Sequence, residues 1–255
     1  MSSIAEELAV VVVQGSFQTS LVYQKLSDTI RARGYQTFQP ELPSCSNTDN
    51  PDFSSKTLQD DSDAVSLVLE RLINNQGKRV VVVMHSYGGI VGSNAIPEEL
   101  SYEFRKEKGL KGGVIYLYYF AAFVLDKGQS VLSAFGESPN NDVRVSPDGT
   151  FCVTEGAKRL YNNLPETEAK MWESRMVYQS HAVQTTEITH TAYKYIPSTY
   201  LICEGDNAVP FQIHEMFAAA AGSEVDRCDA GHSPMLSQCE MLVHKIVAAI
   251  EKTNS

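Results

Sequence analysis

Short, continuous runs of apolar residues, many of them β-branched, constrain this chain more than any other feature. Residues 8–13 read Leu-Ala-Val-Val-Val-Val, and residues 79–84 read Arg-Val-Val-Val-Val-Met. Such runs are typical of strands that are buried on both faces, as in a parallel sheet. Segments with helical spacing of apolar residues alternate with them, which predicts an α/β fold with a doubly wound, mostly parallel sheet. We expect six strands, near residues 8–13, 35–38, 79–84, 113–123, 198–203 and 224–228.

One long segment, residues 127–195, differs from the rest of the chain. It is more polar, has a helical pattern and contains no long apolar run. We interpret it as a helical cap, or lid, inserted before the fifth strand, with residues 1–126 and 196–255 forming the core domain. The helices expected in the core are near residues 20–32, 57–73, 211–221 and 238–252.

The overall composition restricts the possible partners. With 21 basic and 31 acidic residues the net charge is 21 − 31 = −10, so we expect neither nucleic acid nor an anionic membrane as a partner. The five cysteines are odd in number and form no C-x-x-C, which argues against a disulfide framework or a zinc site. No dinucleotide or phosphate-binding motif is present, so no cofactor is expected. We predict a cytoplasmic monomer or homodimer that acts on a small molecule.

The clearest chemical motif is the segment His85-Ser86-Tyr87-Gly88-Gly89, which follows the third strand and opens a helix. A serine at a sharp turn between a buried strand and a helix is the arrangement of a nucleophile elbow. The backbones of the strand and the helix nearly touch there, so small residues are needed on both sides; Gly88 meets this need and Met84 meets it poorly. The alternative is a turn serine that caps the helix without chemistry.

A serine nucleophile needs a base, and six histidines are available. His232 lies in a turn-rich loop between the last strand and the last helix. Loops at the carboxyl ends of parallel strands meet at one edge of the sheet, so His232 is placed to meet Ser86. His85 is expected to point away if Ser86 points up, and His214 falls within an apolar-periodic helix. The remaining histidines are His181, His190 and His244.

The base needs an acidic partner that fixes its tautomer. Asp206 follows the fifth strand in the segment Glu-Gly-Asp-Asn-Ala-Val-Pro and is the favoured candidate. Asp126, after the fourth strand, and Glu204 are the competitors. Acyl transfer also needs two backbone N–H groups for the developing oxyanion, and these are expected from Ser16 and Tyr87.

Four segments together resemble the small α/β-hydrolases related to plant methylesterases and hydroxynitrile lyases, which have bacterial and fungal relatives. They are residues 13–26, 85–89, 204–210 and 231–237. The resemblance implies a six-stranded parallel sheet without the N-terminal hairpin of the larger enzymes, a helical cap over the active site, and a triad of Ser86, Asp206 and His232.

The chain also departs from that family's pattern. Gln14 and Gln18 replace two histidines, and Met84 replaces a glycine. Ser233 follows the candidate base where the lyase branch has lysine, and Gly15 stands where that branch has threonine. These two positions favour the esterase branch.

The resemblance therefore implies a serine hydrolase that cleaves a small aromatic or polyketide-like carboxylic ester or lactone. Two other classes stay open: a lyase or carbon–carbon bond-cleaving enzyme on the same triad, and a non-catalytic receptor for a small molecule. Aromatic and small residues of the cap and core are candidates for the substrate pocket, although each of them could equally be packing the core. They are Gly15, Phe17, Tyr119, Phe120, Tyr161, Trp172 and Met176.

Overall fold

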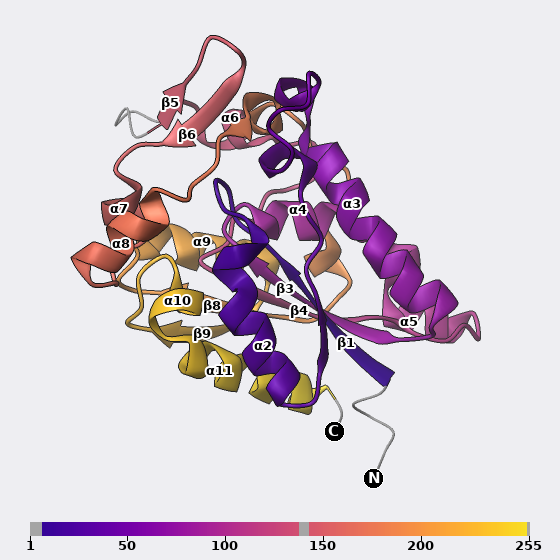
Figure 1. The fold of residues 1–255 in the computed structure, drawn as a ribbon. Coiled ribbons are helices and arrows are strands. Elements are labelled where there is room, and N and C mark those ends of the chain that lie inside the picture. The colour runs from indigo at the N-terminus through magenta and orange to yellow at the C-terminus, as the bar shows by residue number, and fades with distance from the viewer. Residues whose placement is uncertain (1–6, 138–142, 254–255) are drawn as a thin grey trace.

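A computed structural model, which describes residues 7–137 and 143–253, contains one six-stranded sheet (Figure 1). The strand order is β2-β1-β3-β4-β8-β9, and all neighbours are parallel. This confirms the predicted doubly wound parallel sheet. The strands are β1 (Leu8–Val13), β2 (Gln36–Phe38), β3 (Arg79–His85), β4 (Gly113–Phe120), β8 (Ser198–Cys203) and β9 (Glu224–Cys228).

The register of the strands brings their carboxyl ends to one edge. Val13 of β1 pairs with Met84 of β3, and His85 pairs with Phe120 of β4. The last residues of β8 and β9, Cys203 and Cys228, are also paired. The loops that follow these strands must therefore emerge side by side, which is where a parallel sheet binds ligands.

Helices cover both faces of the sheet, as right-handed crossovers require when the strand order reverses. Helices α2 and α11 pack together on one face, and α3 and α4 pack together on the other (Figure 1). In α3 the chain continues into a π-helical turn over Arg71–Asn75. The core helices are α2 (Gln24–Ala32), α3 (Leu58–Glu70), α4 (Gly88–Asn94), α5 (Tyr102–Glu107), α9 (Phe211–Ala221), α10 (Pro234–Ser237) and α11 (Cys239–Lys252).

The segment between β4 and β8 is not purely helical, contrary to the expectation for residues 127–195. It contains α6 (Val131–Phe135), α7 (Gly156–Arg159) and α8 (Glu166–Glu173), and also a three-stranded antiparallel sheet. The strands of that sheet, β5 (Val143–Val145), β6 (Thr150–Val153) and β7 (Gln179–Ser180), are two to four residues long. Strands this short carry too few residues for a recognisable alternation of apolar and polar side chains.

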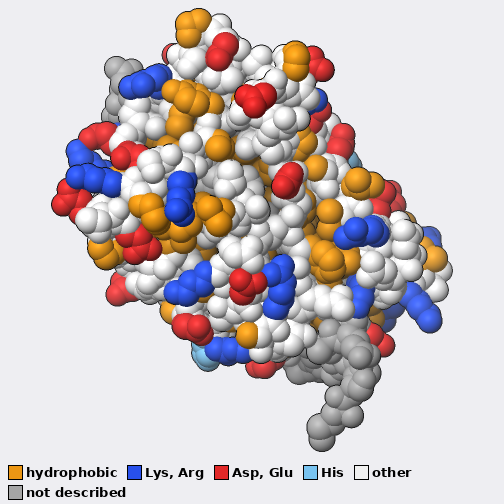
Figure 2. Space-filling view, viewed as in Figure 1, with side chains coloured by type: hydrophobic (Ala, Val, Ile, Leu, Met, Phe, Trp, Pro, Cys, Tyr) orange, Lys and Arg blue, Asp and Glu red, His pale blue; other side chains and the backbone are white. Residues whose placement is uncertain are grey.

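Acidic and basic side chains are interspersed on the face shown in Figure 2, with apolar side chains between them. All five cysteines are free thiols. Among residues 7–137 and 143–253, no helix is both long enough and apolar enough to cross a membrane.

Candidate active site

Ser86 occupies a strained turn between β3 and α4. Its φ is +52°, a left-handed conformation that costs a non-glycine residue on the order of 1 kcal/mol or more. The turn is held because the Ser86 carbonyl accepts hydrogen bonds from the N–H groups of Gly89 (3.0 Å) and Phe123 (2.9 Å). A Cβ atom on Gly88 would lie 2.5 Å from the backbone oxygens of Val13 and Gln14. The close approach that an elbow requires is therefore present at Gly88.

The bulk of Met84, two residues before Ser86, is accommodated by a glycine in the following helix. A Cβ atom on Gly92 of α4 would lie 2.5 Å from Met84 Sδ and 2.8 Å from its Cγ. The methionine side chain thus lies directly against the Gly92 backbone and is fully buried. Gly92, one helical turn after the glycines of the elbow, therefore provides the space that the Met84 side chain needs.

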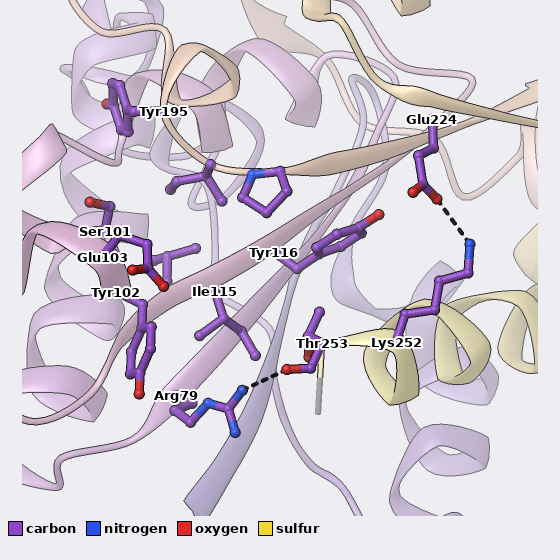
Figure 3. A pocket seen from close by; sticks show the side chains of 13 residues that line it. Arg79, Ser101, Tyr102, Glu103, Ile115, Tyr116, Tyr195, Glu224, Lys252 and Thr253 are labelled. Carbon is purple, nitrogen blue, oxygen red and sulfur yellow. Dashed lines mark hydrogen bonds and ion pairs between the residues drawn. The ribbon is translucent and has the colours of Figure 1, made fainter. Parts of the chain in front are cut away.

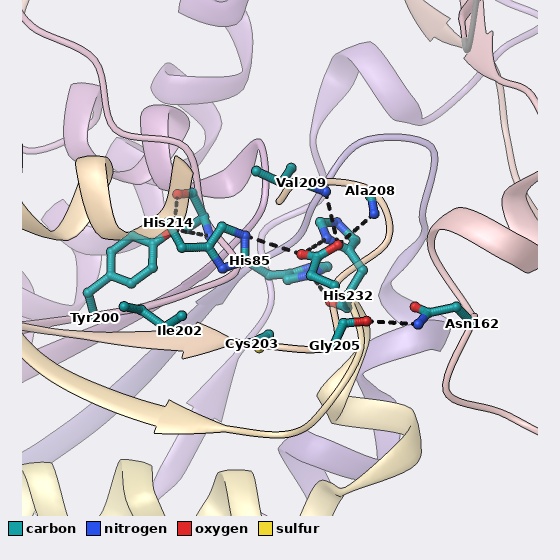
Figure 4. Close-up of polar contacts among 12 residues, drawn as sticks. His85, Asn162, Tyr200, Ile202, Cys203, Gly205, Ala208, Val209, His214 and His232 are labelled. Atoms are coloured by element: carbon teal, nitrogen blue, oxygen red, sulfur yellow. Dashed lines mark hydrogen bonds and ion pairs between the residues drawn. The ribbon is translucent and has the colours of Figure 1, made fainter. Parts of the chain in front are cut away.

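His232 and Asp206 form a buried hydrogen-bonded pair. His232 Nδ1 lies 2.7 Å from Asp206 Oδ2, and Asp206 Oδ1 accepts from the N–H groups of Ala208 (2.7 Å) and Val209 (3.0 Å) (Figure 4). Burial opposes ionisation of Asp206, but the nearby His232 and the hydrogen bonds outweigh it, so the pKa of this carboxyl is lowered. An ionised Asp206 leaves Nδ1 of His232 protonated and Nε2 as the nitrogen available to act as a base.

A second histidine, which was not predicted from the sequence to lie in the site, approaches the same carboxylate. His214 of α9 is fully buried, and its Nε2 lies 3.2 Å from Asp206 Oδ2, although the alignment is not that of a good hydrogen bond. The contact of His214 with Asp206 could not be predicted from the sequence, because a buried histidine on the apolar face of a helix has the spacing of an ordinary core residue.

His85 does not point away from the site, contrary to expectation. Its Nε2 lies 2.8 Å from the carbonyl oxygen of His232, and the two rings are 4.8 Å apart (Figure 4). The His85 ring also stacks on the Phe120 ring, with the two centroids 4.7 Å apart. Side chains alternate between the two faces of a regular strand, but the positive φ of Ser86 interrupts that alternation at the end of β3. His85 therefore contacts the loop that carries His232.

The turn after β1 packs directly against Ser86. A Cβ atom on Gly15 would lie 2.9 Å from the Ser86 Cβ, so only glycine fits there. Within the described part of the chain, the backbone N–H groups of Ser16 and Tyr87 donate to no other group. Two unpaired donors beside a candidate nucleophile are what an oxyanion site requires.

The side chain of Tyr87 is held by a buried acid. Asp61 of α3 is fully buried and accepts hydrogen bonds from the Tyr87 hydroxyl (2.8 Å) and from the Ser44 hydroxyl (2.5 Å) and N–H (2.9 Å). Burial raises the pKa of Asp61 to about 6, against hydrogen bonds from Ser44 and Tyr87 that lower it. Gln179 of β7 donates to the Ser44 hydroxyl (2.9 Å), which ties the inserted segment to this cluster.

Three contacts place the inserted segment over the candidate site. Asn162 Nδ2 donates to the Gly205 carbonyl at 2.8 Å, beside Asp206 (Figure 4). A Cβ atom on Gly231 would lie 2.5 Å from Asn162 Oδ1, so the same side chain also touches the histidine loop. Val177 N–H donates to the Phe17 carbonyl at 3.0 Å, in the turn after β1.

The predicted pocket residues fall into two groups. Phe17, which has a φ of +63°, packs edge-on against Phe151, and the Tyr161 hydroxyl lies 3.4 Å from the Gln18 amide, so both border the turn after β1. Gly15 lies against Ser86, and the Phe120 ring stacks on the His85 ring. Among the described residues, no hydrogen bond or ring contact joins the remaining three to the Ser86, Asp206 or His232 side chains. These three are Tyr119, Trp172 and Met176.

The two competing acids are engaged elsewhere. Asp126 accepts from Tyr193 (3.1 Å) and Lys194 (2.9 Å), and Glu204 forms an ion pair with Arg227 at 3.1 Å. Of the three acids considered, Asp206 is the one that contacts His232.

A cavity of about 330 Å³ lies at the opposite edge of the sheet, near the beginnings of the strands (Figure 3). It is lined by Arg79 at the start of β3 and by Glu224 at the start of β9, which pairs with Lys252 at 2.9 Å. Neither Ser86 nor His232 lines it. We therefore place the candidate site at the carboxyl edge, where the strained serine and the buried acid–histidine pair are.

The chain belongs to the alpha/beta hydrolase family, because residues 10–244 match the model of that family. It is 28% identical over 252 residues to the alpha/beta hydrolase nvfD of Aspergillus novofumigatus, covering 93% of this chain and 94% of that protein. It is also 28% identical over 250 residues to the probable hydrolase R7 of a Phoma species, covering 91% and 94%. The crystal structure of polyneuridine aldehyde esterase has the same fold, with a TM-score of 0.73, 17% identity and coverage of 95% and 99%.

Proposed function

We propose that this protein is a serine hydrolase that cleaves a small carboxylic ester or lactone through an acyl-enzyme on Ser86. The observation that carries the proposal is the buried hydrogen bond between His232 Nδ1 and Asp206 Oδ2 (2.7 Å), on the loops beside a serine with a φ of +52°. A buried carboxylate that fixes one histidine nitrogen frees the other for base catalysis. The names of polyneuridine aldehyde esterase and of the fungal hydrolases agree with this class.

In the proposed reaction, Ser86 Oγ attacks the carbonyl carbon of the substrate while His232 Nε2 takes its proton. The oxyanion accepts hydrogen bonds from the N–H groups of Ser16 and Tyr87, each worth about 3 kcal/mol of barrier in comparable sites. Collapse of the tetrahedral intermediate breaks the bond to the leaving oxygen, which takes the proton from His232. Water then attacks the acyl-enzyme with His232 again as base and releases the acid and free Ser86.

The Ser86 hydroxyl makes no hydrogen bond to another described residue. In enzymes of this kind the hydrogen bond between nucleophile and base often tightens only when substrate binds. We therefore expect the hydrogen bond between Ser86 and His232 to form when substrate binds.

We further propose that the substrate is aromatic or polyketide-like. Aromatic side chains border the turn after β1, with Phe17 and Phe151 in edge-to-face contact at 5.0 Å. Apolar, aromatic walls with a few fixed polar groups suit such ligands. Trp172 and Met176 of the inserted segment would extend this wall over the bound substrate.

A panel of aryl and alkyl esters and of five- and six-membered lactones tests the proposal. We expect wild-type protein to hydrolyse at least one of these classes, and Ser86→Ala to lose about 10³-fold or more of kcat. Ser101→Ala is a matched control, because Ser101 is also buried but lies at the opposite edge of the sheet. Hydrolysis that survives in Ser86→Ala would contradict the proposal, and turnover of β-keto or hydroxynitrile substrates instead of esters would replace it with a lyase on the same residues.

A further inference from the structure

The Tyr23 hydroxyl lies at the centre of a buried hydrogen-bond network beside the candidate site. Tyr23 ends a short 3-10 turn, Ser20–Tyr23, and is buried. Its oxygen lies 2.8 Å from the Gly15 nitrogen, 2.6 Å from His85 Nδ1 and 2.5 Å from Gln18 Oε1. A single side chain thus joins the turn after β1 to the residue that precedes Ser86.

The second contact of the His85 ring fixes the position of its proton. Nε2 lies 2.8 Å from the His232 carbonyl oxygen (Figure 4). A carbonyl oxygen can only accept, so Nε2 must carry a proton. Burial and the neighbouring His232 keep the pKa of His85 well below its usual value, so the ring is neutral and Nδ1 has no proton.

The single proton of the Tyr23 hydroxyl then goes to His85. Burial holds the pKa of Tyr23 well above its usual value, so the hydroxyl stays protonated and donates to the bare Nδ1. The Tyr23 oxygen accepts the Gly15 N–H and has one lone pair left for the Gln18 amide. The two orientations of the Gln18 side-chain amide have the same shape. The orientation that turns the NH2 group towards Tyr23 leaves the amide oxygen facing the Tyr161 hydroxyl, from which it can accept a hydrogen bond.

We propose that Tyr23 is a positioning residue. Its hydroxyl fixes the position of the Gly15 turn directly and that of the His232 backbone through His85, so that both lie correctly beside Ser86. The inference rests on the proposed function, because the Gly15 turn carries one oxyanion donor and the His232 loop carries the base. Tyr23 contacts neither of the proposed reacting side chains. It acts by fixing where the Ser16 N–H group and the His232 ring lie, and misplacement by 1 Å in such sites costs about 100-fold in rate.

The proton arrangement can be tested without any assay of activity. Long-range ¹H–¹⁵N correlation spectra of protein labelled with ¹⁵N-histidine report which ring nitrogen carries the proton, and His85→Gln assigns the signals. We expect His85 to be neutral and protonated on Nε2 throughout the neutral pH range. Protonation on Nδ1, or titration of His85 near neutral pH, would overturn the inference even if no substrate is known.

The functional arm compares Tyr23→Phe with Tyr118→Phe on an ester that the wild-type protein hydrolyses. Tyr118 of β4 is also buried, and its hydroxyl has no hydrogen-bond partner among the described residues. We expect Tyr23→Phe to lower kcat about 10- to 100-fold with KM within about threefold, and Tyr118→Phe to leave both unchanged. A purely structural role would lower stability in thermal denaturation and leave kcat of the folded fraction intact.

The outcomes separate this inference from the proposed function. An inactive wild-type protein would contradict the proposed function, and the histidine spectra would still decide the Tyr23–His85 arrangement. An active wild-type protein with an unchanged kcat in Tyr23→Phe, or with a change confined to KM, would overturn the positioning role alone. If Tyr23→Phe does not fold, the spectra of the wild-type protein remain the deciding measurement.

Discussion

Replacement of Asp206 by Asn changes the acid–histidine pair with almost no change of shape. Four nitrogens surround the carboxylate, those of Ala208 and Val209 on one oxygen and those of His232 and His214 on the other. Three of them, the two backbone nitrogens and His232 Nδ1, donate hydrogen bonds to the carboxylate, and an amide has only one acceptor oxygen. If that oxygen stays with the two fixed backbone N–H groups, the NH2 group of the new side chain meets His232 Nδ1.

His232 must then change tautomer. Its Nδ1 loses the proton in order to accept, and Nε2 gains one and can no longer deprotonate Ser86. The same exchange lowers kcat about 10⁴-fold in serine proteases. We therefore expect kcat/KM of Asp206→Asn to fall about 10³- to 10⁴-fold, which is about 4–5 kcal/mol of barrier. The free energy of unfolding should fall by only about 1–3 kcal/mol, as for one impaired buried hydrogen bond.

The assay is steady-state hydrolysis of the best ester from the panel, with urea denaturation of each variant in parallel. Asp126→Asn and Glu204→Gln are matched controls, because both acids form their contacts away from His232. Both controls should keep wild-type kcat/KM within about threefold. A loss of less than about tenfold in Asp206→Asn, or an equal loss in either control, would contradict the role of Asp206 in fixing the His232 tautomer.

Three further changes test the packing and electrostatics around the elbow. Gly89→Ala would push a methyl group into the Phe123 carbonyl oxygen, and we expect a loss of about 2–3 kcal/mol in urea denaturation; wild-type stability would contradict the close approach. Gly92→Ala should cost about 1 kcal/mol, because overlap with Met84 exceeds the gain in helix propensity, and should become stabilising in a Met84→Ala background; additive effects would show that the two side chains do not touch. The pKa of Asp61 is about 6 in the folded protein and 3.8 in the unfolded chain. Protonation of Asp61 should therefore stabilise the folded state by about 3 kcal/mol below about pH 3.8, and this contribution should be lost as the pH rises through 6. The unfolding free energy of Asp61→Asn, measured at about pH 4 and pH 7, should accordingly depend less on pH than that of the wild-type protein, and parallel curves would exclude a raised pKa.

The core of the fold could be predicted because its signals are local and repeated. Runs such as 8–13 and 198–203 are long enough to identify buried strands, and the structure gives β1 and β8 those same bounds. The predicted fourth strand was too long, since β4 ends at Phe120 and the positive φ of Ala121 (46°) turns the chain away. The sheet β5-β6-β7 was missed because strands of two to four residues give no periodic signal.

The features of the candidate site that could not be predicted from the sequence are contacts between side chains of different segments. The positions of Ser86, Asp206 and His232 after three strands placed them at one edge, which topology alone dictates. The contacts of His85 with Tyr23 and of His214 with Asp206 depend on side-chain directions in the folded chain. No spacing rule relates Tyr23 and His85, which are 62 positions apart, or Asp206 and His214, which are separated by a loop and the start of α9. These partners could therefore be found only in the structure.

Covalent labelling by a fluorophosphonate tests most directly the claim that Ser86 is an activated nucleophile. Intact-mass spectrometry after incubation at neutral pH, with peptide mapping, counts and locates the adducts. We expect one adduct on Ser86, which is absent in Ser86→Ala and forms much more slowly in His232→Ala. An adduct on another residue, or no adduct on folded protein with either the fluorophosphonate or a smaller sulfonyl fluoride, would contradict it.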